Sequence, residues 1–199
     1  MAKVMSAEPV LDVDVARLSD GERAELLQLG ALSQDGSLLP HALPQHLAVR
    51  PQIERKAVSS PSVLNEAYCY ERPSSFSRAV TFDIGNVTML LVSGTASVDE
   101  NGRTVHVGDF RAQCWRTYRN ISQLLESAGM TWHDIVRTTC YLRDIERDYK
   151  DFNEVRTAFF GWLALEPLPA STGIQARLCR EDLLVEIEAI AIAPRNGGR

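Results

Sequence analysis

The sequence predicts an α+β domain built from one mixed β-sheet with two helices packed on one face. Two segments with apolar residues every three or four positions predict the helices, and short apolar or alternating segments predict the strands. The expected order is strand, strand, strand, helix, strand, helix, strand, strand. No helix remains for the opposite face of so apolar a sheet, so the domain is expected to cover that face by association of subunits.

The first three strands are predicted between residues 76 and 107. Residues 76–82 can form a strand, and residues 87–98 contain the run VTMLLV, which is typical of a buried strand. The segment 99–102 ends in Asn101-Gly102, a strong hairpin signal, and therefore predicts a short third strand over 103–107.

The helices are predicted over 109–128 and 148–163. Asp109 can cap the first, and Gly129 is its expected end. Pro167 and Pro169 close the second. A strand over 135–142 separates the helices, and two strands over 173–179 and 183–192 are predicted to form a final hairpin joined by a polar turn.

Residues 1–60 have a different character from the rest of the chain. Ser19 and Glu22 form a capping-box pattern before several leucines, which predicts a short helix over 19–29. The following stretch is rich in Pro, Ser and Gln and has no sustained period. We interpret 1–60 as an arm that packs on the domain (61–199) or on a neighbouring subunit. A disordered tail is the alternative, and the leucine content argues against it.

The composition is that of a soluble globular protein, with 45% apolar and 24% charged residues among 199. The net charge is −5 and the charges are interspersed, so no nucleic-acid partner is expected. No apolar run approaches the roughly 20 residues that span a bilayer. The N-terminus lacks the pattern of a signal peptide, and a cytoplasmic protein without a membrane partner is expected.

The cysteines and histidines show no metal-binding pattern. The four cysteines are widely spread and are interpreted as buried thiols in a reducing compartment, rather than as a disulfide framework or a zinc site: Cys69, Cys114, Cys140 and Cys179. The four histidines are equally scattered. Neither a bound metal nor a cofactor is expected.

Glu186 and Glu188 share one face of the last predicted strand, where two carboxylates are costly to bury. One explanation is that they pair with arginines such as Arg177 or Arg137 and hold subunits together. The other is that Glu186 lines a half-dry pocket. Desolvation there would raise its pKa and make it a usable general acid at neutral pH.

Several motifs from residue 76 onward occur together in one order and spacing. The most specific is PASTGIQARLCREDLLVEIEAIA over 169–191, and the others are Val92-Ser93-Gly94, Asn120, the run 134–139, Tyr149, Phe152-Asn153 and Phe159-Phe160. Over these 117 or so residues the chain resembles the Rid superfamily, also called the YjgF or L-PSP family. The resemblance implies a chorismate-mutase-like fold and a homotrimer with pockets at its subunit interfaces. It also implies chemistry on small enamines and imines, which are released as ammonia and 2-oxo acids.

The same resemblance assigns most of the candidate site. Glu186 matches the family's pocket glutamate, which helps to position or protonate the substrate and its attacking water. Ser93 and Gly94 match the pocket floor, and Asn153 matches an amide on the second helix. Phe76 stands where the family usually has a tyrosine.

Two further positions depart from the family pattern. Gly173 replaces a frequent pocket cysteine and leaves a possible backbone donor. Ser171 replaces the arginine with which the family's deaminases grip the substrate carboxylate, and a short neutral hydroxyl cannot act as that fork of donors. Ser171 and Thr172 are therefore expected to serve as turn residues or hydrogen-bond donors. Arg177, predicted to face Glu186 across the last hairpin, is the expected replacement clamp or an ordinary cross-strand partner.

The C-terminal run also resembles the chorismatases, which hydrolyse the enolpyruvyl ether of chorismate with a glutamate as acid. Cys179, Arg180 and the stretch 182–186 carry this resemblance. Cys179 is expected either as a packing residue or as a thiol activated by its neighbour Arg180. The chain is much shorter than a chorismatase, so a subgroup of Rid-like proteins is the expected classification.

The leading hypothesis is a homotrimer that binds a small carboxylate-bearing metabolite at its subunit interfaces. Glu186 would act there as general acid/base in the hydrolysis of an enamine, imine or enol ether. A non-catalytic small-molecule-binding or chaperone-like protein is the alternative. An endoribonuclease is a third hypothesis, which the acidic charge and the lack of a basic groove disfavour.

Overall fold

The computed structural model describes residues 11–40, 53–71 and 73–195, and the chain divides into two compact units, Met1–Gln52 and Ile53–Arg199. The first unit contains a 3₁₀ turn, η1 (Val15–Arg17), and the helix α1 (Asp20–Gln28). The predicted capping box is present, because the Ser19 hydroxyl accepts the N–H of Glu22 and the Glu22 carboxylate accepts the N–H of Ser19.

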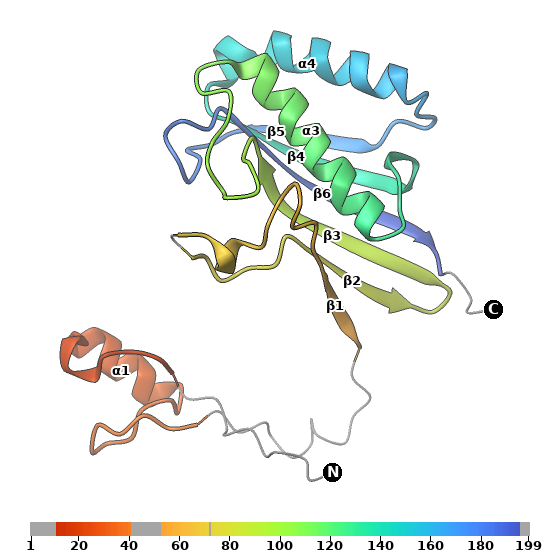
Figure 1. Cartoon of the computed structure of the whole chain (residues 1–199). Helices are drawn as coiled ribbons and strands as arrows, with labels where there is room; N and C mark the ends of the chain where they lie inside the picture. The colour runs from red at the N-terminus through yellow and green to blue at the C-terminus, as the bar shows by residue number, and fades with distance from the viewer. Residues whose placement is uncertain (1–10, 41–52, 72, 196–199) are drawn as a thin grey trace. The chain divides into compact units, whose positions relative to one another are not determined.

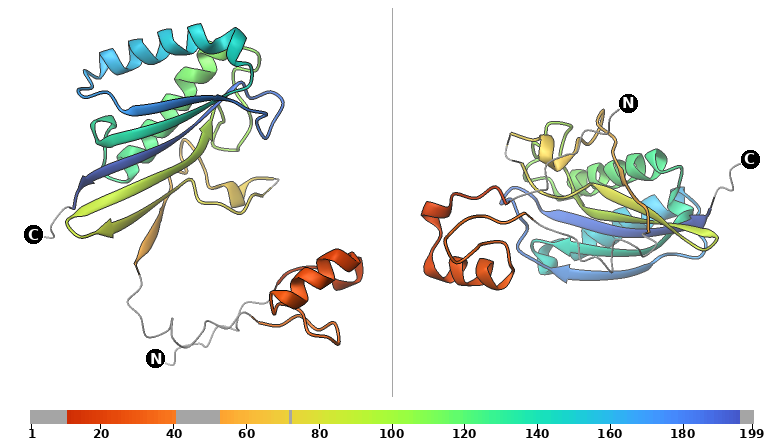
Figure 2. Two further views of the ribbon diagram at one scale, coloured as in Figure 1. Left: turned by 180° about the vertical axis from the view of Figure 1, so that it is seen from behind. Right: turned by 90° about the horizontal axis from the view of Figure 1, so that it is seen from below.

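The second unit is one six-stranded mixed sheet with the helices α3 and α4 on one face (Figures 1 and 2). The strand order is β1-β2-β3-β6-β4-β5, in which only β4 and β5 pair in parallel. The fold class is the predicted one. The elements are β1 (Arg55–Val58), β2 (Ala79–Ile84), β3 (Val87–Ala96), α3 (Phe110–Ser127), β4 (Ile135–Leu142), α4 (Ile145–Trp162), β5 (Ala170–Gln175) and β6 (Val185–Pro194).

The predicted strand over 103–107 is wrong. The Asn101-Gly102 turn forms, with the Asp99 N–H donating to the carbonyl of Arg103, but only a single bridge between Val98 and Thr104 follows. The chain then leaves the sheet toward the capping residue of α3. The missing position in the strand order is taken by β1, which pairs with β2 from within the segment interpreted as the arm.

The predicted hairpin of the last two strands is also wrong. β4 lies between β5 and β6, and β5 runs parallel to β4 after the crossover through α4. β5 ends at Gln175, so residues 176–184 form a connection rather than the arms of a hairpin. A polar turn between two apolar runs shows that the chain reverses, but it does not show which strand lies beside which.

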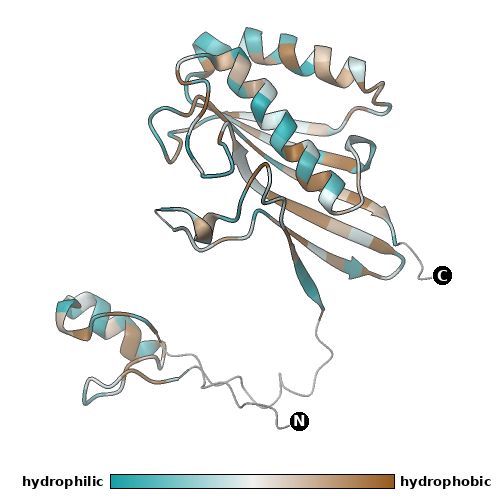
Figure 3. Ribbon diagram, viewed as in Figure 1, coloured by the Kyte–Doolittle hydropathy of each residue, from teal (hydrophilic) through white to brown (hydrophobic). Residues whose placement is uncertain are grey.

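The core lies between the sheet and the two helices. Tyr118 of α3 stacks on Phe159 of α4 at 4.6 Å between ring centroids, and Trp132 packs edge-on against both rings. Figure 3 shows the alternation of polar and apolar residues along α3 and the apolar central strands. None of the helices in the described ranges is long and apolar enough to cross a membrane.

Two buried amide side chains on α3 fix the segments that carry the site. Asn120 donates to the carbonyls of Ala96 and Val98, at 2.9 and 3.0 Å, where β3 ends. Gln113 donates to the carbonyl of Asp182 and accepts the N–H of Leu184, immediately before β6. Because buried backbone groups need such partners, these two amides hold the ends of β3 and β6 in place.

The sheet face without helices, here called the open face, carries exposed apolar side chains. Leu91, Ile174 and Ile192 are on it, in register with other residues of the face. The uncovered apolar face therefore exists as predicted.

The prediction of four buried cysteines is wrong for two of them. Cys114 of α3 and Cys140 of β4 are buried, and burial raises the pKa of both thiols. Cys69 and Cys179 are exposed: Cys69 ends the 3₁₀ turn η2 (Ala67–Cys69), and Cys179 lies in the connection between β5 and β6. All four are free thiols.

Candidate functional site

Glu186 lines a cavity of about 350 Å³, here called the Glu186 pocket, at one end of the open face. The segment leading into β2, here called the covering segment, contributes Ala67, Tyr70, Ser74, Phe76 and Arg78 to the pocket lining. The pocket brings together five predicted site residues: Phe76, Ser93, Gly94, Cys179 and Glu186. Tyr70, Ser74, Arg78 and Arg180 complete its polar lining.

The Glu186 side chain packs directly against Gly94. A Cβ atom at this position would stand 1.9 Å from Glu186 Oε1 and 2.9 Å from its Cδ. The strand register shifts between Val92 and Thr95, so the carboxylate passes over an irregular part of β3. The absence of a side chain at Gly94 is what admits the carboxylate to the pocket floor.

Ser93 mainly forms hydrogen bonds with the backbone around it. Its hydroxyl donates to the carbonyl of Ser77 at 2.8 Å, and its N–H donates to the carbonyl of Arg78 at 3.0 Å. These bonds tie the covering segment to β3. The hydroxyl oxygen keeps its capacity to accept a hydrogen bond from a ligand.

Arg78 is a site residue that the sequence analysis missed. It is only 5% exposed, its guanidinium lies over the rings of Tyr70 and Phe76 at 5.0 and 5.1 Å, and it donates to the carbonyl of Asn65. Its backbone N–H donates to the Glu66 carboxylate at 3.2 Å, but among the described residues no carboxylate oxygen lies within 4.0 Å of its guanidinium nitrogens. The nearly buried Arg78 guanidinium beside Glu186 can therefore bind an anionic group of a ligand.

The environment of Glu186 favours its neutral form. Loss of hydration in the pocket raises the pKa of the carboxyl above its ordinary value, and Glu188 on the same face raises it further. The charge of Arg78 acts in the opposite direction and limits the rise of the pKa. Glu186 therefore keeps its proton to a higher pH than an exposed glutamate, which suits a general acid.

The raised pKa of Glu186 predicts how a Glu186→Gln variant changes stability with pH. A group whose pKa is raised by folding contributes stability below its ordinary pKa of 4.5, and this contribution is lost as the pH rises through the folded value. The neutral amide of glutamine does not titrate, so its contribution to the free energy of unfolding does not change over that pH range. The free energy of unfolding of the variant, relative to the unchanged chain, should therefore rise with pH and level off above the folded pKa. Urea denaturation at acidic and neutral pH measures it, and a pH-independent difference would contradict the electrostatic assignment.

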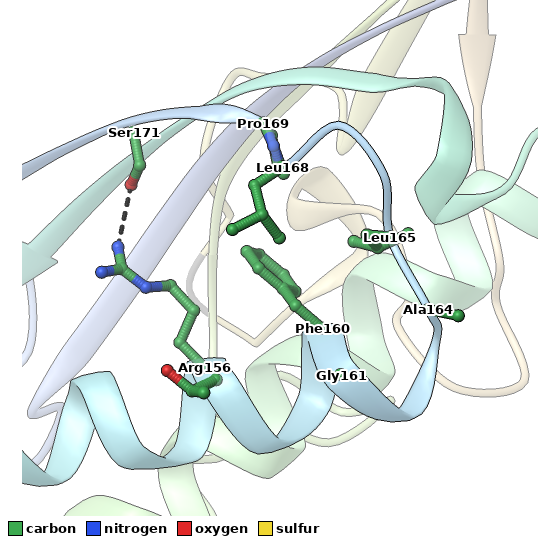
Figure 4. A pocket seen from close by; sticks show the side chains of 9 residues that line it. Arg156, Phe160, Gly161, Ala164, Leu165, Leu168, Pro169 and Ser171 are labelled. Atoms are coloured by element: carbon green, nitrogen blue, oxygen red, sulfur yellow. Dashed lines mark hydrogen bonds between the residues drawn. The ribbon is translucent and has the colours of Figure 1, made fainter.

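Three further predicted residues, Ser171 and Gly173 of β5 and Asn153 of α4, lie on the helix-covered side of the sheet. Ser171 is in register with Thr138 and accepts its hydroxyl hydrogen at 3.1 Å. Arg156 of α4 donates from Nη1 to the Ser171 hydroxyl at 3.1 Å (Figure 4) and from Nη2 to Asn153 Oδ1. Gly173 is two residues further along the same face of β5, next to Tyr149 of α4.

A second cavity, of about 380 Å³, adjoins these residues and is here called the β5–α4 pocket. Figure 4 shows Arg156 and Ser171 at one side of it, with Phe160 and Leu168 beside them. Its lining is Arg156, Thr157, Phe160, Gly161, Ala164, Leu165, Leu168, Pro169 and Ser171.

One chain does not bring the two groups of site residues together. Glu186 is in register with Tyr141 on the open face, whereas Ser171 is in register with Thr138 on the helix-covered face. No residue lines both cavities. Thr172 points to the open face, where Arg137 donates to its hydroxyl at 3.2 Å. Each chain thus presents two separate groups of predicted site residues, here called half-sites.

The predicted position of Arg177 opposite Glu186 is wrong. Arg177 lies beyond the end of β5, and its exposed guanidinium is 3.5 Å from the equally exposed carboxylate of Glu181. The error follows from the predicted hairpin, which placed Arg177 on a strand next to β6. Within the described ranges, no three His, Cys, Asp or Glu side chains are grouped to hold a metal ion.

Comparison with known proteins places the second unit in a family. The family model described as Endoribonuclease L-PSP matches residues 71–193. A RutC family protein of Pyrococcus abyssi is 34% identical over 108 residues, which are 54% of this chain and 80% of that protein. The 3-aminoacrylate deaminase RutC of Acinetobacter baylyi is 35% identical over 103 residues, 52% of this chain and 78% of that protein.

The crystal structure of the YjgF gene product from E. coli has the same fold. It superposes with a TM-score of 0.56 at 27% identity and covers 71% of this chain and 99% of its own. Sequence motifs, the family model and the fold agree. The chain therefore belongs to the Rid superfamily, the YjgF or L-PSP family of proteins.

Proposed function

We propose that the chain forms a homotrimer which binds a small carboxylate-bearing metabolite at its subunit interfaces. It hydrolyses an enamine, imine or enol-ether group there, with Glu186 as the general acid/base. The observation that carries the proposal is the Glu186 carboxylate on the floor of its pocket, with a pKa raised by desolvation and a buried Arg78 beside it. A relative named 3-aminoacrylate deaminase supports the reaction class.

A single carboxyl group can carry out the proton transfers of the reaction. Protonated Glu186 gives its proton to the terminal carbon of an enamine, which becomes an iminium ion. The resulting carboxylate takes a proton from the water that attacks the iminium carbon. The carbinolamine then breaks its C–N bond and releases ammonia and a 2-oxo acid. An enol ether follows the same course through an oxocarbenium ion and releases an alcohol in place of ammonia.

The arrangement of the two half-sites supports an interfacial site. The open face carries both the Glu186 pocket and exposed apolar side chains, which an associating subunit would cover. Ser171 and Gly173 of β5, with Asn153 of α4, lie on the other side of the sheet. In a cyclic assembly, the Glu186 half of one subunit can meet the β5 half of its neighbour.

A non-catalytic binding protein is the second candidate, because Ser171 offers no charge to a substrate carboxylate. The two candidates differ in product release. The wild-type chain is mixed with 2-aminoacrylate-type imines generated in the assay, and ammonia and 2-oxo acid are followed against the spontaneous rate. Release above that rate supports the hydrolase. Binding of 2-oxo acids without faster release supports the non-catalytic protein, and neither binding nor release would overturn both.

A further inference from the structure

The Arg156 guanidinium contacts three neighbouring side chains, none of which carries a negative charge. Ser171 and Asn153 accept its hydrogen bonds, and its Cζ atom lies 5.1 Å from the ring centroid of Phe152. Among the described residues no carboxylate oxygen lies within 4.0 Å of it. An arginine fixed in place has already lost the side-chain freedom that binding would cost, and it retains donors for an anion.

The surroundings of Arg156 are apolar on the side away from Ser171. Phe160, Leu165, Leu168 and Pro169 line the same cavity, and Leu168 is 63% exposed although it is a large apolar side chain. Figure 4 shows Leu168 and Phe160 packed beside each other across from Arg156. The pocket thus offers one cation at one side and an apolar wall at the other, which is the pattern of a site for an amphipathic small molecule.

We infer that the β5–α4 pocket binds a carboxylate that carries a branched or aromatic apolar group. Arg156 contacts the carboxylate, and Phe160, Leu168 and Pro169 contact the apolar group. The inference rests on the proposed function only in that the ligand is a small carboxylate. It adds the residue that binds the charge and the class of side chain that the ligand carries.

The small side chain of Ser171 leaves space in the pocket for this ligand. Ser171 lines the pocket, occupies little volume and positions the guanidinium through its hydroxyl. The cavity of about 380 Å³ is within the range of small-molecule pockets and is larger than a three-carbon acid fills. Additional apolar carbon atoms on the ligand would be buried against Phe160 and Leu168 and would tighten binding.

Calorimetric titration of the full chain with 2-oxo acids tests the inference. The probes are pyruvate, 4-methyl-2-oxopentanoate and phenylpyruvate. We expect the two larger acids to bind at least about tenfold more tightly than pyruvate, because they bury more apolar surface. Arg156→Met should weaken binding of all three by about tenfold or more. Leu168→Ser should weaken only the two larger acids.

Two controls keep the result interpretable. Lys150→Ala removes a positive charge from an exposed position of the same helix and should leave affinity within about twofold. Arg156→Gln keeps a polar side chain beside Ser171 without the charge, and it should lose affinity as Arg156→Met does. Far-UV circular dichroism confirms that each variant is folded.

The outcomes separate this inference from the proposed function. Equal affinity for pyruvate and the larger acids, or unchanged affinity in Arg156→Met, would overturn the inference even if imines are hydrolysed. Arg156-dependent binding of the larger acids would uphold it even if no imine is hydrolysed.

Discussion

Replacement of Glu186 by glutamine is expected to lower kcat for imine hydrolysis by about 10²–10⁴-fold, the usual contribution of a general acid/base. Glutamine keeps the shape and fits over Gly94, but it can neither give a proton to the enamine carbon nor take one from water. Because substrate contacts are kept, KM should change far less than kcat. Steady-state assays of ammonia release measure both constants.

Glu188→Gln is the matched control. Glu188 lies two residues further along the same face of β6, opposite Thr139, and does not line the Glu186 pocket. This variant should keep kcat within a few-fold of the unchanged chain. If the Glu186→Gln variant is as active as the Glu188→Gln variant, Glu186 is not the general acid/base of the reaction.

Gly94→Ala is expected to cost about 10²-fold in kcat/KM, since a displacement of the order of 1 Å at a reacting group has effects of this size. The added Cβ would lie 1.9 Å from Glu186 Oε1, so the carboxylate must leave the pocket floor. Gly94 does not require a positive φ, so the backbone itself tolerates alanine. The loss should therefore appear in activity rather than in the fold.

Gly21→Ala provides the comparison for this substitution. In α1 the added Cβ would approach no atom closer than 3.9 Å, and the helix gains a better helix former. Its kcat/KM should match that of the unchanged chain. If the Gly94→Ala variant is as active as the Gly21→Ala variant, the Glu186 carboxylate does not react from its position over Gly94.

The fold could be predicted where local signals and tertiary packing agree. Asp109 caps α3 as its position before the apolar stripe indicates, and its side chain accepts the N–H of Ala112. The apolar run of β3 gives a buried strand. By contrast, β1 begins with the charged Arg55 and Lys56, and only its pairing with β2 makes it a strand. The parallel partner of β5 depends on the crossover through α4, which no local pattern specifies.

The candidate site was predictable by motif but not in its arrangement. Motif positions identified Glu186 and Gly94, which the structure places against each other. Arg78 and Arg156 were not predicted from the sequence, because an unpaired cation is recognised only when its neighbours are known. One signal for Arg156 was available: it follows Asn153 by three residues on a predicted helix and therefore shares its face.

The most direct test of the account is activity in trimers assembled from two inactive variants. Glu186→Gln disables one half-site, and Gly173→Trp blocks the other with a bulky side chain at the β5 edge. If each pocket joins the Glu186 half of one subunit to the β5 half of the next, random mixing in equal amounts restores about a quarter of the pockets. The account predicts activity approaching that fraction of the wild-type value. Mixed trimers no more active than the separate variants would contradict it.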